Sequence, residues 1–135
     1  MRLGPTMLVP AVLLLVLIDV VGGGWAVASG LNTLGDAFSG DARMAAPWPM
    51  IAFQLVAALA AMRARRRGAI VAAVLLALAC IVSAVSGFFD GALAAPGMSR
   101  AQVGFQIVLV GWTAFVGVLA IARVSALVRP RASSA

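Results

Sequence analysis

Four runs of apolar residues, each long enough to cross a lipid bilayer, constrain this chain more than any other feature of its sequence. A hydrocarbon core about 30 Å thick requires roughly 20 consecutive apolar residues in helical form. Such runs cover residues 7–28, 45–62, 68–89 and 101–124, and the second is the shortest. Backbone polar groups in lipid must be paired within each segment, so we expect helices. The sequence predicts an all-α, four-helix transmembrane bundle, with residues 1–135 forming one integral membrane domain.

The composition agrees with a protein surrounded by lipid. The chain is 64% hydrophobic and 10% charged, whereas a soluble domain is about 25% charged. Its net charge of +6 comes from arginines gathered in short stretches between long uncharged ones, a pattern typical of membrane anchoring. We therefore expect the lipid bilayer as a partner and no nucleic acid. The abundance of Ala, Gly, Val and Arg without Lys indicates GC-rich coding, and hence a bacterial inner (plasma) membrane.

The arginines also predict the orientation of the four helices. Residues 63–67, between the second and third runs, carry four arginines and no acid. Further arginines precede the first run and follow the fourth, whereas the other two loops are nearly balanced in charge. Because positively charged loops stay on the cytoplasmic side, both termini are predicted inside. A competing interpretation is that residues 1–28 are a cleaved signal peptide ending in Ala26-Val27-Ala28. Asp19, directly after the apolar core, favours a retained span instead.

Missing residue types exclude most catalytic chemistry. The chain has no His, no Glu and one cysteine, Cys80. The common zinc, haem and di-iron ligand sets therefore cannot be assembled, nor can a Ser–His or Cys–His nucleophile pair. We expect no enzyme activity, no metal site and no cofactor, and we interpret Cys80 as a small apolar core residue.

The two halves of the chain share a sequence pattern. Residues 38–47 and 89–96 each contain Gly and Asp followed by Ala-Ala-Pro. Phe-Gln-aliphatic-Val follows at residues 53–56 and 105–108. The pattern favours a duplicated two-helix hairpin with parallel copies, in which Gln54 and Gln106 are equivalent. Chance matches are frequent in Ala-rich sequences, so coincidence stays open as the alternative.

Polar residues within the predicted spans are the candidates for function. At 1.5 Å per residue from the outer helix ends, Asp19 lies on the order of 12 Å deep, and Gln54 and Gln106 about 10 and 7 Å deep. The candidates for ligand binding or proton carriage, all in or at the outer half, are Asp19, Gln54, Gln106, Ser83, Ser86 and Asp90.

Two interpretations of these polar residues compete. They could form hydrogen bonds between helices, worth about 0.6 kcal/mol each, or they could line a small pocket open to the outer side. The pocket is favoured most at Asp19, because moving a carboxyl from water into hydrocarbon costs much free energy and no cation lies at its depth to pair with it. We expect an amide of Gln54 or Gln106 to donate to it.

Two further groups of residues have ordinary roles in membrane helices. Trp25 and Trp48 lie near the outer ends of the first two runs and are predicted to anchor there at the interface. Gly22, Gly23 and Gly24 are typical of close helix contact or a local kink.

The layout resembles the small multidrug-resistance exporters, four-helix bacterial membrane proteins that carry an acid in their first helix. Here that acid is Asp19 in place of the family's Glu, and the family's aromatic set and short first loop are missing. The resemblance implies an oligomeric proton-coupled transporter in which Asp19 is the coupling acid, and we retain this as the alternative function. The residues themselves favour a non-catalytic protein. It would be an accessory subunit with a membrane-protein partner or a second copy, or a binder of an apolar ligand such as a lipid or quinone.

Overall fold

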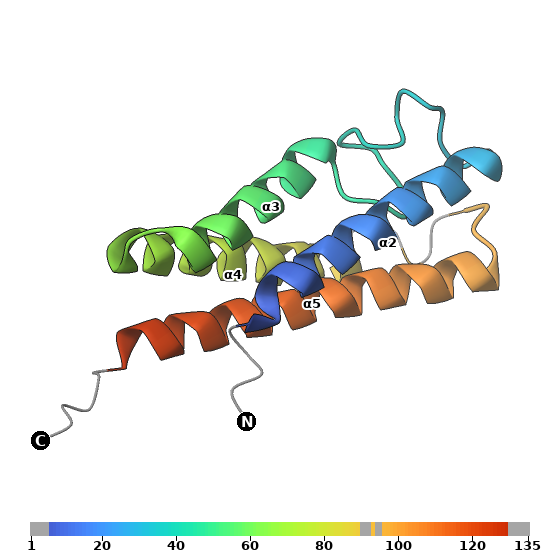
Figure 1. Ribbon diagram of the computed structural model, residues 1–135. Helices are drawn as coiled ribbons and strands as arrows, with labels where there is room; N and C mark the ends of the chain where they lie inside the picture. The colour runs from blue at the N-terminus through green and yellow to red at the C-terminus, as the bar shows by residue number, and fades with distance from the viewer. Residues whose placement is uncertain (1–5, 90–92, 94–95, 130–135) are drawn as a thin grey trace, which may run out of the picture.

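A computed structural model describes residues 6–89, 93 and 96–129 of the chain. The chain forms four α-helices, namely α2 (Leu8–Ala28), α3 (Trp48–Arg63), α4 (Arg66–Phe89) and α5 (Arg100–Val128) (Figure 1). Each begins within three residues of the run expected from the sequence, and the described residues contain no strand. The all-α, four-helix architecture is therefore confirmed.

Three of the helices are long and apolar enough to cross a membrane, and α3 is shorter. α2, α4 and α5 have 21, 24 and 29 residues. The 16 residues of α3 rise about 24 Å, less than the roughly 30 Å of a hydrocarbon core. Pro47 and Pro49 explain the late start of α3, because proline lacks an N–H and is tolerated only near the beginning of a helix. α3 alone is therefore shorter than such a core, and an irregular segment directly precedes it.

This segment, residues 37–47, folds back against α2. Ala37, Met44 and Ala45 are buried. A Cβ added to Gly22 would overlap the carbonyl oxygen of Met44, so only glycine lets the segment approach α2 here. Gly22 and Gly23 thus admit the folded-back segment, through Met44 and Phe38, and Gly22 also lies close to Phe105 of the neighbouring α5, whereas Gly24 contacts neither. The buried residues of this segment are covered by protein, whereas Gly40 and Asp41 at its turn are exposed.

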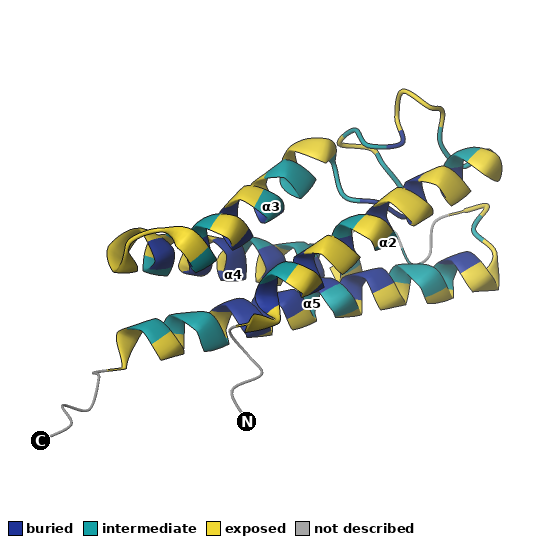
Figure 2. Ribbon diagram, in the orientation of Figure 1, coloured by how far each residue is buried: buried dark blue, intermediate teal, exposed yellow. Residues whose placement is uncertain are grey.

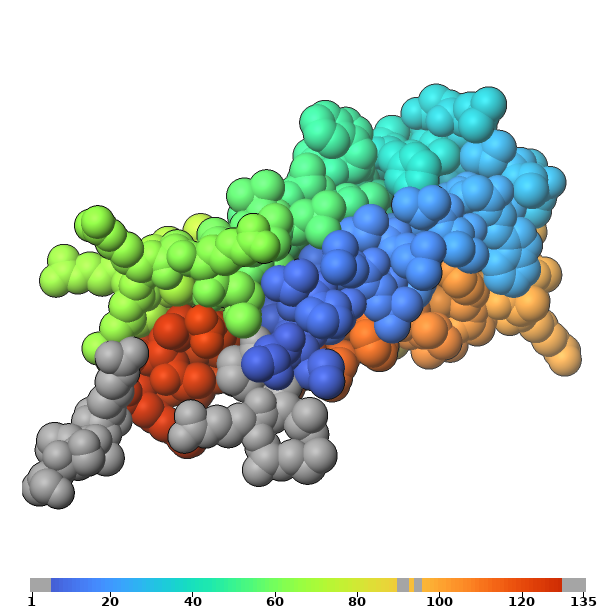
Figure 3. Space-filling view, viewed as in Figure 1, coloured from blue at the N-terminus to red at the C-terminus, as the bar shows by residue number. Residues whose placement is uncertain are grey.

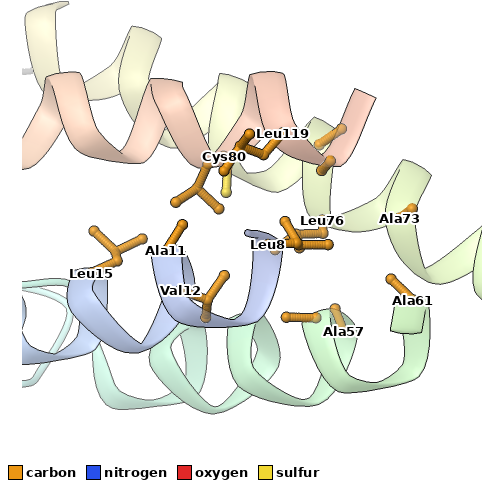
Figure 4. Close-up of a cluster of buried hydrophobic side chains, with 14 of the residues drawn as sticks. Leu8, Ala11, Val12, Leu15, Ala57, Ala61, Ala73, Leu76, Cys80 and Leu119 are labelled. Atoms are coloured by element: carbon orange, nitrogen blue, oxygen red, sulfur yellow. The ribbon is translucent and has the colours of Figure 1, made fainter. Parts of the chain in front are cut away.

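The core of the bundle is built from aliphatic and small side chains. Contacts are most extensive between α4 and α5, and α2 packs on both α3 and α5. Leu8, Val12 and Leu76 are fully buried in one hydrophobic cluster (Figure 4). Small residues let the helix backbones come close, as where Ala61 and Ala73 lie in this cluster.

The outer surface of the bundle is apolar. Leu17 on α2, Val56 on α3 and Val118 on α5 are 57%, 67% and 60% exposed. Exposed positions follow one side of each helix and buried positions the other (Figure 2). Contiguous apolar surface of this extent is unfavourable in water and favourable in lipid. The structure therefore supports a membrane protein.

Arginines stabilise the end of the bundle at which α3 ends and α4 begins. The Arg66 Nε donates to the carbonyl oxygen of Leu127 at 2.8 Å, and the Arg123 Nε donates to that of Ala61 at 3.1 Å. The last carbonyls of a helix lack partners and carry partial negative charge, so cations near them are favourable. We call this the Arg-rich end. Its cytoplasmic location stays a prediction from the charge pattern.

Candidate functional site

Asp19 is buried in α2 and hydrogen-bonded to the folded-back segment. Its side chain is 1% exposed, and its Oδ1 accepts from the backbone N–H of Ala46 at 2.7 Å. Its Oδ2 is also buried and has no hydrogen-bond partner in the described part of the chain. The expected donation from Gln54 or Gln106 is wrong, because the partner is a backbone group that no side-chain pattern reveals. One carboxyl oxygen thus holds the segment in place, and the other is left without a partner.

Gln54 on α3 and Gln106 on α5 occupy matching places in their helices. Each lies six residues after the first residue of its helix, Trp48 or Arg100. Gln54 is 1% exposed and Gln106 is half-buried, and the buried Oε1 of each has no partner among the described residues. This common position agrees with a duplicated hairpin. Part of the second copy, residues 90–92, 94 and 95, lies outside the described residues.

A cavity brings the candidate side chains of four helices together. Its volume is about 380 Å³, and α2, α3, α4 and α5 all contribute to its wall. The predicted residues that line it are Asp19, Gln54, Ser83, Ser86 and Gln106. Asp90, the remaining candidate, lies outside the described residues. We call this space the outer cavity, after the orientation that the charge pattern predicts.

Other buried polar side chains have satisfied hydrogen bonds, and this separates them from the candidates. Gln102 completes a capping box with Ser99 at the start of α5, and its Nε2 donates to the Ser29 Oγ at 2.8 Å. Thr113 donates to the carbonyl oxygen of Leu109 at 2.9 Å within α5. More than nine in ten buried polar groups are hydrogen-bonded in folded proteins. The three residues that carry unpartnered buried oxygens, Asp19, Gln54 and Gln106, all line one cavity, which makes it the candidate site.

Sequence reasoning missed one wall of the outer cavity. Gly40, Asp41 and Ala42 line it from the folded-back segment, and Pro47 and Met50 line it from the start of α3. The sequence indicates before α3 only a loop that is nearly balanced in charge. The signal that could have revealed this wall is the shortness of the second apolar run together with its two prolines.

Trp25 and Trp48, the two tryptophans predicted to be anchors, lie on the outside of the bundle. The Trp25 ring packs edge-on against Phe105, with 5.7 Å between ring centroids, and Trp48 is 66% exposed. Both therefore present indole surface outside the core, and their role as interfacial anchors stays a prediction.

No protein-family model, no curated protein and no solved structure matches this chain. The resemblance to the small exporters therefore rests on layout alone.

Proposed function

We propose that this chain is a non-catalytic membrane protein that binds an apolar compound, of the lipid or quinone class, in the outer cavity. The observation that carries the proposal is that Asp19 lines the cavity and that its Oδ2 is buried without a hydrogen-bond partner, so that a small side-chain movement would let a ligand reach this oxygen. A cavity of about 150 Å³ accommodates benzene, so about 380 Å³ leaves room for a substituted ring or a lipid head. Leaving a buried polar group unsatisfied costs about 1–3 kcal/mol, and a ligand that supplies the missing hydrogen bond would recover it.

The lining favours a head group with hydrogen-bond donors and no negative charge. Asp19 and Asp41 belong to the described lining, and no arginine does. A phosphate would be repelled there, whereas a hydroxyl or an amine can donate to the Asp19 Oδ2. The amides of Gln54 and Gln106 can present either an acceptor or a donor, so they adapt to the rest of the head. A quinol meets these requirements.

The same carboxyl supports proton-coupled transport as a second candidate. A buried carboxyl with one free oxygen in a cavity is typical of proton carriers in membranes. Uptake driven by a proton gradient into vesicles that contain the purified protein would favour this candidate over simple binding.

A test of ligand binding compares a short-chain prenylated hydroquinone with its dimethyl ether, which has the same ring without donors. The protein is placed in phosphatidylcholine nanodiscs, and dissociation constants are obtained from the rise in melting temperature with ligand concentration. A hydrogen bond to a charged group contributes about 1.5–3 kcal/mol, so we expect the hydroquinone to bind at least about tenfold more tightly. Equal binding of the two compounds, or no binding of either, would contradict the proposal.

Matched glutamine variants show whether the hydroquinone occupies the outer cavity. Gln54→Leu combined with Gln106→Leu removes two unpartnered oxygens, so this double variant should fold as stably as the wild type and bind the hydroquinone more weakly. Gln102→Leu removes satisfied hydrogen bonds outside the cavity, so it should lower stability by about 1–3 kcal/mol and leave the affinity unchanged. Unchanged affinity in the double variant, together with weaker binding in Gln102→Leu, would show that the hydroquinone binds outside this cavity.

A further inference from the structure

A second cavity lies at the Arg-rich end, away from the outer cavity. Its volume is about 470 Å³, and Arg66, Arg123 and Arg129 line it. The rest of its wall is small or apolar and consists of Ala64, Ala69, Ala126 and Leu127. The start of α4 and the end of α5 lie side by side here (Figures 1 and 3). We call this space the Arg cavity.

Two of its guanidinium groups are held in place and still have free donors. Arg66 donates from Nε to Leu127 and from Nη2 to Val128, and Arg123 donates from Nε to Ala61. A guanidinium has five N–H donors. Both Nη groups of Arg123 and the Nη1 of Arg66 therefore make no hydrogen bond within the described chain. The side chains are already fixed, so a ligand that uses these donors would lose little conformational entropy.

The positive charge at this end has no counter-charge on the surrounding helices. α3, α4 and α5 contain no acidic residue at all. The neighbouring Arg63, Arg65 and Arg67 are exposed and raise the positive potential further. Like charges gathered in this way repel one another, and an anion from outside the chain would offset the repulsion.

We infer that the Arg cavity binds the phosphate of an anionic phospholipid. Phosphate oxygens match the paired donors of a guanidinium, and basic pockets between membrane helices suit such head groups. Outside the cavity the same two helices expose apolar side chains, and Val71 on α4 and Ile121 on α5 are 58% and 46% exposed. Acyl chains can lie along this surface while the head occupies the cavity, whereas free phosphate gains nothing from it.

Native mass spectrometry of the full chain in detergent tests this assignment. The protein is titrated with phosphatidylglycerol, with the zwitterionic phosphatidylcholine and with inorganic phosphate. We expect phosphatidylglycerol to bind at least about tenfold more tightly than phosphatidylcholine, and an equal concentration of inorganic phosphate not to displace it. Displacement of phosphatidylglycerol would show that the cavity binds free phosphate. Equal binding of the two lipids would show that the charge of the head group does not contribute to affinity. Either result overturns the inference.

Arginine variants with equal loss of charge locate the binding. Arg123→Gln combined with Arg129→Gln removes two cavity charges, and we expect phosphatidylglycerol affinity to fall about tenfold or more. Arg65→Gln combined with Arg67→Gln removes the same charge outside the cavity and should lower the affinity less than about threefold. The side chain of Arg129 makes no hydrogen bond within the described chain, so the single variant Arg129→Gln tests the site if loss of the hydrogen bond from Arg123 to Ala61 prevents folding of the double variant. Equal losses in the two double variants would contradict a specific site.

Discussion

Asp19→Asn is expected to leave the fold intact and to weaken binding of the short-chain hydroquinone by about tenfold or more. The Asn oxygen can continue to accept from the Ala46 N–H, so the segment stays attached to α2. The amide nitrogen then takes the place of Oδ2 and presents a donor where the ligand also has one. Thermal unfolding and the titration in nanodiscs measure the two effects separately.

Asp41→Asn is the matched control for this change. Asp41 also lines the outer cavity and loses the same charge, but its side chain is exposed. We expect its hydroquinone affinity to stay within about threefold of the wild type, because exposed charges interact weakly through solvent. Unchanged stability and unchanged affinity in Asp19→Asn would show that the carboxyl only holds the segment. Loss of proton-driven uptake in this variant would instead support the transporter.

Gly22→Ala is expected to lower the free energy of unfolding by about 1–3 kcal/mol and to weaken ligand binding as well. The new Cβ would overlap the Met44 carbonyl and lie 2.6 Å from the Phe105 Cε1. A backbone oxygen cannot move aside as a flexible side chain can, so residues 44–46 have to shift away from Asp19. Unfolding by titration with a denaturing detergent measures the loss of stability.

Gly24→Ala provides the comparison two residues further along α2. A Cβ on Gly24 meets nothing within 4 Å, so the substitution should be neutral or should stabilise by up to about 1 kcal/mol through helix propensity. If Gly22→Ala and Gly24→Ala behave alike, the segment does not pack on α2 as described.

The helices could be predicted because their signals are local. Each apolar run had to become a helix to pair its backbone in lipid, and Pro47 and the Ser99 capping box set where α3 and α5 begin. The approximate depth of Asp19, Gln54 and Gln106 followed from the helical rise alone. Their placement around one cavity agrees with that count.

The folded-back segment could not be predicted because its contacts are non-local and involve the backbone. The N–H of Ala46 is the partner of Asp19, and any residue except proline would offer the same donor. Met44 has a φ of 64°, in the left-handed region that non-glycine residues rarely adopt, and nothing in its sequence neighbourhood signals this turn. The sequence marked Gly22 as a point of close approach. Only the structure shows that the Met44 carbonyl is what approaches it.

The central claim is that the outer cavity holds an apolar compound by hydrogen bonds to Asp19, Gln54 and Gln106. The most direct measurement is mass spectrometry of compounds released from protein purified from its own membranes. The account predicts a compound with an apolar tail and a neutral or cationic donor-bearing head, close to one per chain. Less of it should co-purify with the Gln54→Leu/Gln106→Leu variant, which binds it more weakly. A wild-type protein that carries no such compound, or a double variant that retains it unchanged, would contradict the account.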